Sequence, residues 1–242
     1  SLLADAGTGL QPGLENLFGA LQSSVDDPSS LAAREVVISE ANSLIDRFTT
    51  ISDRLNAQND IINGQMEVIA GEITTIAEAI AELNEQISFA TASAQGNEPS
   101  EMLDQRDRLL KQLSEYVEVN VVEQDGSSIN VFIGNGQSLV IGNDFNEVFT
   151  DIGANDPSRV DIYFRKGNSV QNVTREITGG QLGGILDFRE QVLDPTMNGL
   201  GRIALTIAQT MNDQHKLGID YDGLKGENFF EDINDPLKTY ER

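Results

Sequence analysis

A seven-residue repeat of apolar side chains runs through a long stretch of the chain that contains no proline, between Pro28 and Pro99. The repeat consists of Ala41, Phe48, Leu55, Ile62, Ile69, Ile76, Leu83 and Ala90. This spacing is typical of one long α-helix with a buried seam, and at about 1.5 Å per residue the helix would span roughly 90 Å. A compact chain of this size has a radius of gyration of only about 18 Å. The pattern therefore predicts an elongated rod.

A second apolar row accompanies the first and changes its spacing partway. Leu44 and Ile51 lie three residues after members of the first row, whereas the later members, Met66, Ile73, Ile80 and Ile87, lie four residues after. The changeover contains Gln58, Asn59, Asn63 and Gly64. We expect a continuous helix whose packing partner changes at these residues. A break at Asn63-Gly64 is the alternative.

Shorter helices are predicted on both sides of the long one. Residues 11–25 carry an amphipathic stripe formed by Leu14, Leu17, Phe18 and Leu21. Asp27 then suits the N-cap of the long helix, with Pro28 in its first turn. After the loop at 96–100, a third helix is expected from Pro99 to about Tyr116, with Leu103, Leu110 and Leu113 on its buried face.

The period falls to two between residues 117 and 177, which predicts a small antiparallel β unit. Hairpin turns are expected at Asp125-Gly126 and Asn135-Gly136. The apolar positions of the strands are Val117, Val119 and Val121, then Val131 and Ile133, residues 139–141, then Val160, Ile162 and Phe164, and residues 173–177.

The helical period returns after the glycine-rich residues 179–184, with Leu186, Leu193, Leu200 and Ile207 seven residues apart. Pro195 should kink or divide this helix, and Gly218, with Lys216 in the last turn, should end it. The predicted class is α+β: an elongated antiparallel helical bundle with a small antiparallel β subdomain. Its domains would be a helical rod (1–116 and 178–218), a β insert (117–177) and the start of an outer domain (219–242).

The formal net charge is −23 and the sequence pI is near 4.1. Such a surface repels nucleic acid and anionic membranes, so neither is expected as a partner. No basic residue lies between Arg54 and Arg106, so Glu–Lys pairs cannot stabilise that part of the long helix. Its stability must come from burial of the apolar seam.

The composition and the first residues of the chain limit the kinds of protein and of site that the sequence can encode. No run of about 18 apolar residues could span a membrane, and no cysteine is available for disulfides or thiolate metal sites. The chain begins at Ser1 without a methionine or a visible signal peptide. We therefore expect a piece of a longer protein.

No catalytic constellation is predicted. His215 is the only histidine, no cysteine is present and no Gly-x-Ser-x-Gly occurs, which argues against a nucleophile–base triad. The glycines at 179–184 do not fit a phosphate-binding fingerprint, because Gln181 occupies a required glycine position. We expect these glycines to allow tight entry into a closely packed helix.

Two further candidate binding sites have weak support in the sequence. Asp220 and Asp222 with Glu231 resemble a calcium loop, yet Leu224 holds a ligand position and Lys225 replaces the required glycine. Arg106 and Arg108 follow the acidic stretch and are expected to form ion pairs within the chain; a contact with a partner is the alternative. We therefore predict no catalytic, cofactor-binding or metal-binding residue, and no enzymatic activity.

Several motifs occur in a fixed order between residues 102 and 230. They are 102–107 (Met-Leu-Asp-Gln-Arg-Asp), Leu113-Ser114, 131–140 (Val-Phe-Ile-Gly-Asn-Gly-Gln-Ser-Leu-Val), Gly179 to Gly184, 185–189 (Ile-Leu-Asp-Phe-Arg), 212–215 (Asn-Asp-Gln-His), Gly218 and Phe229-Phe230. In this order they resemble the flagellar hook-associated protein 1 family of bacteria, over residues about 10 to 235.

The resemblance implies a helical rod domain with a small β portion, similar to the inner rod domain of flagellin. It also implies a structural, non-enzymatic subunit of the hook–filament junction, exported to the outside of the cell with the help of the flagellar export apparatus and a chaperone. The implied partners are the hook protein, the second hook-associated junction protein and further copies of the same chain in a ring. Terminal segments that build the innermost tube in this family, and its outer β domains, are expected outside this sequence.

Two other hypotheses remain open at the level of sequence. An acidic helical adaptor would bind a basic partner, and a calcium-dependent surface protein would use the Asp-rich loops near the C-terminal end.

Overall fold

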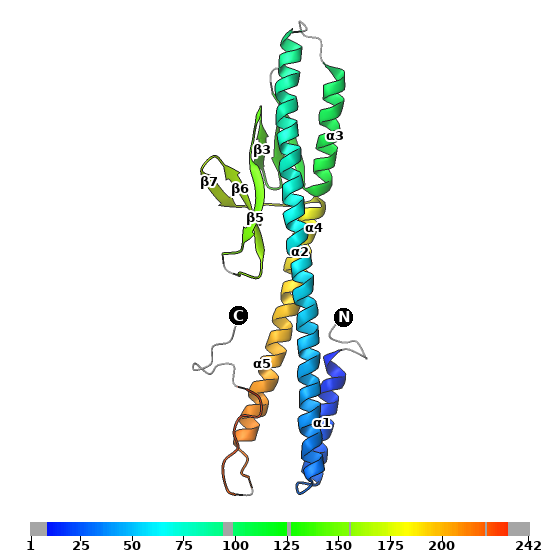
Figure 1. Cartoon of the computed structure of the whole chain (residues 1–242), viewed down its shortest axis with the longest axis vertical. Coiled ribbons are helices and arrows are strands. Elements are labelled where there is room, and N and C mark those ends of the chain that lie inside the picture. Colours follow the sequence, from blue (N-terminus) through cyan, green and yellow to red (C-terminus); the bar gives the residue numbers. More distant parts are fainter. Residues whose placement is uncertain (1–8, 94–98, 125–126, 155, 221, 232–242) are drawn as a thin grey trace. The chain divides into compact units, whose positions relative to one another are not determined.

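The predicted long helix is one continuous element, α2 (Leu31–Ser93), in the computed structural model, which describes residues 9–93, 99–124, 127–154, 156–220 and 222–231 (Figure 1). It contains 63 residues, so its axis is about 95 Å long at about 1.5 Å per residue. The helix continues through Asn63-Gly64, and the alternative of a break there is wrong.

The predicted N-cap of α2 is also wrong. Asp27 lies at the C-terminal end of α1 (Leu10–Asp26), where its backbone N–H donates to the carbonyl of Ser23. Ser30 has the capping role, because its Oγ accepts a hydrogen bond from the N–H of Ala33 at 3.2 Å. The residues between Asp27 and Ser30 are needed to reverse the chain, so the helix begins three residues later than Pro28 suggested.

Both apolar rows of α2 are buried, as predicted. In the first row Phe48 and Ala90 are half-buried and the other members are buried. The second row is more deeply enclosed, with exposed fractions of 2 % or less for Leu44, Ile51, Met66, Ile73, Ile80 and Ile87. Burial of these rows, rather than surface charge pairs, holds the helix in place.

The chain divides into two compact units, and α2 contributes to both. Unit 1 comprises the residues up to Asn56 and those from Asp194 onward, and unit 2 comprises Ala57–Leu193. The division falls beside the polar changeover predicted at residues 58–64. In unit 1 α2 packs against α1 and α5, and in unit 2 it packs against strands, α3 and α4. The expected change of packing partner is therefore confirmed.

Unit 1 is helical. The buried core shared by α1 and α2 consists of Leu17, Ala20, Val37, Ala41 and Leu44. α5 (Asp194–Lys216) follows in the same unit and ends near Gly218, as predicted; the N–H of Gly218 donates to the carbonyl of His215 at 3.1 Å.

Unit 2 combines helices with two small antiparallel sheets. The helix α3 (Ser100–Tyr116) begins after Pro99, as predicted. One sheet has the order β1-β2-β3-β4 and the other β5-β6-β7. The strands are β1 (Val119–Glu123), β2 (Ile129–Ile133), β3 (Gln137–Ile141), β4 (Asp144–Phe145), β5 (Glu147–Ile152), β6 (Val160–Lys166) and β7 (Ser169–Asn172). The α+β class is confirmed.

The hairpin at Asn135-Gly136 is confirmed; Gly136 has φ +93°, which favours glycine. The turn predicted at Asp125-Gly126 lies outside the described residues. The strand predicted at 173–177 is wrong, since these residues form a turn after β7. Val173 and Ile177, at the ends of this segment, are buried. The two apolar positions therefore indicated burial correctly, but the backbone between them is a turn and not a strand. The strands β4, β5 and β7 were not predicted.

Polar side chains of α2 fasten the strands to the helix by pairing with their backbone. The hydroxyl of Thr74 donates to the carbonyl of Val148 at 2.8 Å and accepts from its N–H at 2.9 Å. The amide of Asn84 pairs in the same way with Ile129, at 2.8 and 3.3 Å. Asn63 donates to the carbonyl of Ser158 and accepts from the N–H of Val160. Each side chain thus satisfies backbone groups that a neighbouring strand would otherwise bind.

The returning helix is divided next to Pro195, as predicted. α4 (Gly180–Phe188) passes into one π-helical turn, Arg189–Leu193, before α5 starts at Asp194. Proline has no N–H to donate to the preceding turn, and a widened turn of this kind accommodates the missing bond.

Candidate functional site

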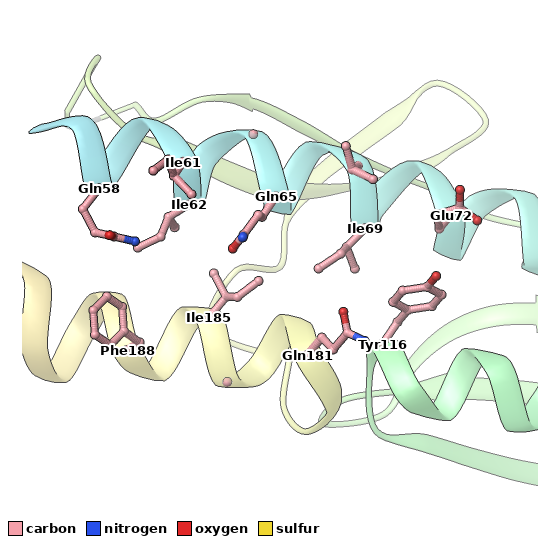
Figure 2. Close-up of a pocket in the computed structure, with 13 residues that line it drawn as sticks. Gln58, Ile61, Ile62, Gln65, Ile69, Glu72, Tyr116, Gln181, Ile185 and Phe188 are labelled. Carbon is pink, nitrogen blue, oxygen red and sulfur yellow. The ribbon is translucent and has the colours of Figure 1, made fainter.

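An open groove of ≈ 870 Å³ lies in unit 2 between α2 and α4, with Tyr116 of α3 at one end (Figure 2). Its walls are largely apolar. Ile61 and Val68 of α2 are 54 % and 65 % exposed, and Phe188 of α4 is 41 % exposed. Ile185 completes the α4 side. Large apolar side chains gathered on one surface are typical of contact sites.

Two glycines leave room in this groove. A Cβ atom added at Gly64 of α2 or at Gly184 of α4 would meet nothing within 4 Å. Glu72 and Tyr116 are the ionisable residues of the lining. The groove therefore provides apolar area and a place for close backbone approach.

The glycines at 179–184 lie where the chain enters α4, and close packing, as predicted, is the role of Gly179, Gly180 and Gly183 but not of Gly184. Gly180 has φ +57°, and a Cβ there would come within 2.4 Å of the backbone of Tyr116 and Val117. A Cβ at Gly179 would lie 2.8 Å from the side chain of Glu118. These contacts join the start of α4 to the end of α3.

Arg106 is buried and organises a polar centre in unit 2. Its Nη1 donates to Asn84 Oδ1 at 3.0 Å and to the carbonyl of Ser127 at 2.7 Å. Asn84 in turn donates to the carbonyls of Ile129 and Gly142. These hydrogen bonds join α2, α3 and the first sheet. Arg108 is exposed.

The remaining sequence candidates belong to unit 1 and to local turns. His215 Nδ1 lies 2.6 Å from the carbonyl oxygen of Glu227, so this nitrogen carries the proton. Asp220 Oδ1 accepts from the N–H groups of Asp222 and Leu224, which is a turn-forming role. In the part of the chain that the structure describes, no group of three or more acidic or histidine side chains could hold a metal ion.

The pKa of Asp156 is lowered from its ordinary value. Its carboxylate accepts hydrogen bonds from the Ser158 hydroxyl at 2.6 Å and the Ser158 N–H at 3.0 Å, and it pairs with Arg159 at 3.2 Å. The hydroxyl bond is the largest cause that lowers the pKa of Asp156 below 3.8. The carboxylate shapes the loop whose Ser158 carbonyl is bound by Asn59 and Asn63 of α2.

The acidic residues of α2 in unit 2 lie on its outer surface. Those exposed are Asp60, Glu67, Glu72, Glu78, Glu82 and Glu85. None of the helices described in the structure is both long enough and apolar enough to cross a membrane.

Sequence reasoning missed two features of unit 2. The groove had a signal, because Ile61 and Val68 lie seven residues apart and off both buried rows, with Gly64 between them. The second feature is the pairing of α2 side chains with strands, made by Asn63, Thr74 and Asn84. Its sequence signal was weaker: polar residues about three turns apart on a buried side of a long helix.

Comparisons with known proteins agree with one another. The family model described as the flagellar hook-associated protein FlgK helical domain matches residues 1–230. Flagellar hook-associated protein 1 of Salmonella typhimurium is 36% identical over 232 residues, which cover 95% of this chain and 42% of the relative. The Escherichia coli protein of the same name is 35% identical, with the same coverage.

A solved structure, that of the flagellar hook junction protein FlgK from Burkholderia pseudomallei, is also similar. Its TM-score is 0.83 at 32% identity, and the match covers 91% of this chain and 40% of that one. The chain thus spans less than half the length of the relatives it matches. The chain belongs to the family of the flagellar hook-associated protein FlgK, whose helical domain it carries.

Proposed function

We propose that this chain is the helical part of a structural subunit of the bacterial flagellum, positioned outside the cell at the hook–filament junction. The observation that carries the proposal is that the family match extends over residues 1–230. The similar fold of a flagellar hook junction protein supports it. The α2/α4 groove is consistent with a role in protein contacts.

The partners proposed for the whole protein are the hook protein, the second hook-associated junction protein and further copies of itself in a ring. Delivery would use the flagellar export apparatus and a chaperone. We further propose that this chain is not an enzyme, because the family that it matches is named for a structural component of the flagellum. Turnover that disappears on replacing His215 would contradict this.

The two other hypotheses are not favoured by the comparisons. A basic-partner adaptor would rely on the exposed acids of α2, which a solvated surface explains equally well. A calcium-dependent surface protein would need the carboxylate of Asp220, which is engaged by two backbone N–H groups.

The domain organisation proposed from the sequence has a helical part (1–116 and 178–218), a β insert (117–177) and an outer domain from residue 219. The hydrogen bonds of Thr74 and Asn84 with strands support treating the β insert as fixed to the helical part.

A domain exchange tests the proposed function. The matching region of the Salmonella typhimurium relative is replaced by this chain, and the chimera is expressed in a strain that lacks the native gene. We expect export of the chimera and filament assembly at a level comparable to that of the native gene. Export of a folded chimera that supports no filament would refute the proposal. A matched chimera carrying Ile76→Asp, which places a charge in the buried seam, is the negative control.

A further inference from the structure

The chain that follows α5 turns back on unit 1 and is fastened there by residues 226–230, which we call the clasp. The N–H of Gly226 donates to the carbonyl of Gly218 at 3.0 Å. A Cβ at Gly226 would lie 2.1 Å from the carbonyl oxygen of His215, closer than any side chain can approach. Only glycine can bring the chain this near to the end of α5.

The last residue of the clasp is held through both of its backbone groups. Asn212 of α5 is 6 % exposed; its Nδ2 donates to the carbonyl of Phe230 at 2.9 Å, and its Oδ1 accepts from the N–H of Phe230 at 2.7 Å. The side-chain amide therefore pairs with Phe230 as a neighbouring strand would. A buried amide satisfied at both ends fixes one geometry, because any other leaves polar atoms without a partner.

Aromatic packing closes the rest of the clasp. The imidazole of His215 donates to the carbonyl of Glu227, and its ring lies 5.8 Å from that of Phe229. The rings of Phe229 and Phe230 meet edge to face at 4.9 Å, and both pack against the core shared by α1 and α2. Phe230 also lines a cavity with Ile207 and Ala208 of α5.

We propose that the clasp closes unit 1 and is the structural end of the helical domain. The match to the family's helical domain also ends at residue 230, the residue that Asn212 holds. Residues 219–230 would then belong to the helical domain, and an outer domain would begin after Phe230 rather than at residue 219. The inference is independent of the proposed flagellar function, because it concerns how unit 1 ends.

Amide hydrogen exchange on the full chain, read residue by residue by NMR, tests the clasp. We expect the N–H groups of Gly226 and Phe230 to be protected in the native protein. Asn212→Leu should speed exchange at Phe230 at least tenfold and leave the amides of the middle of α5 unchanged. Asn198→Leu, at an exposed position of the same helix, is the matched control and should change neither.

A second variant acts from the other end of the clasp. Gly226→Ala cannot place its methyl group beside His215, so it should also speed exchange at Phe230 at least tenfold. The proposal is overturned if Phe230 exchanges at the rate of an unstructured peptide in the native protein. It is also overturned if Gly226→Ala leaves Phe230 protected, or if Asn212→Leu speeds exchange equally throughout α5.

Discussion

The stability of unit 2 should depend on the buried seam of α2, and Ile76 is a direct test. This side chain is 3 % exposed. Ile76→Ala removes the equivalent of about three methylene groups, which corresponds to about 2.4 kcal/mol at about 0.8 kcal/mol each. A residual cavity adds to this cost when the surroundings cannot collapse. We therefore expect Ile76→Ala to lower the free energy of unfolding by about 2–4 kcal/mol.

Glu78, two residues further along the same helix, is the matched control because its side chain is exposed. Glu78→Ala should change the free energy of unfolding by less than about 0.5 kcal/mol. Urea melts followed by circular dichroism measure both variants. With a slope of about 1–3 kcal/mol per molar urea, a loss of about 3 kcal/mol moves the midpoint by about 1–3 M. Equal effects of the two substitutions would show that the seam does not hold the helix.

Three further predictions follow from local geometry. Asn84→Ala should lower the free energy of unfolding by about 3 kcal/mol or more in urea melts, since several buried groups lose partners worth about 1–3 kcal/mol each; a cost below about 1 kcal/mol would contradict the pairing described above. Gly180→Ala should lower the free energy of unfolding in urea melts by about 2–5 kcal/mol, because φ at this residue is +57° and the added Cβ would lie 2.4 Å from backbone atoms. Gly184→Ala has open space around the added Cβ, so it should be neutral or stabilise the helix by up to about 1 kcal/mol. The lowered pKa of Asp156 means that its carboxylate stabilises the fold above pH 3.8, and this stabilisation is lost as the pH falls through the folded-state pKa. A carboxyl NMR titration should give a pKa below 3.8, and Ser158→Ala should raise that pKa; an unchanged pKa in the variant would contradict the prediction.

The helices were predictable because their burial follows one period. Each member of the two rows of α2 depends only on its own position along a regular helix, so the sequence spacing alone identifies the buried side. Pro195 and Gly218 act on the chain locally, and their effects were predicted for the same reason. Asp27 was misassigned because Ser30 offers an equally good cap closer to the first apolar turn.

The strands were less predictable because their partners lie far along the chain. Val173 and Ile177 are buried by a turn whose first N–H donates to the carbonyl of Ile162, a contact that no local pattern records. Most of the apolar side chains of β1 are exposed although its sequence alternates. The strand β5 pairs with β6 and is also held by the hydrogen bonds between Thr74 and Val148, which lie far apart in the sequence.

The polar centre around Asn84 was missed for a related reason. Asparagine on a helix more often faces solvent than core, and nothing near residue 84 identifies Ile129 and Gly142 as its partners. The ion pair expected for Arg106 stays a prediction, and the described hydrogen bonds of this side chain go to the Asn84 amide and a backbone carbonyl. Only the three-dimensional meeting of α2, α3 and the first sheet makes these assignments possible.

The polar side chains of α2 that pair with strands, which we call the anchors, and the apolar seam of the same helix have different physical roles. Burial of apolar surface is non-directional and would tolerate a strand displaced along the helix. The pairing of Thr74 with Val148 and of Asn84 with Ile129 is directional, and a displacement by one residue would leave buried donors and acceptors unsatisfied. The seam therefore supplies most of the stability, and the anchors set the register of the sheets on the helix. For the assembly subunit proposed above, a fixed register is the property that apolar packing alone does not provide.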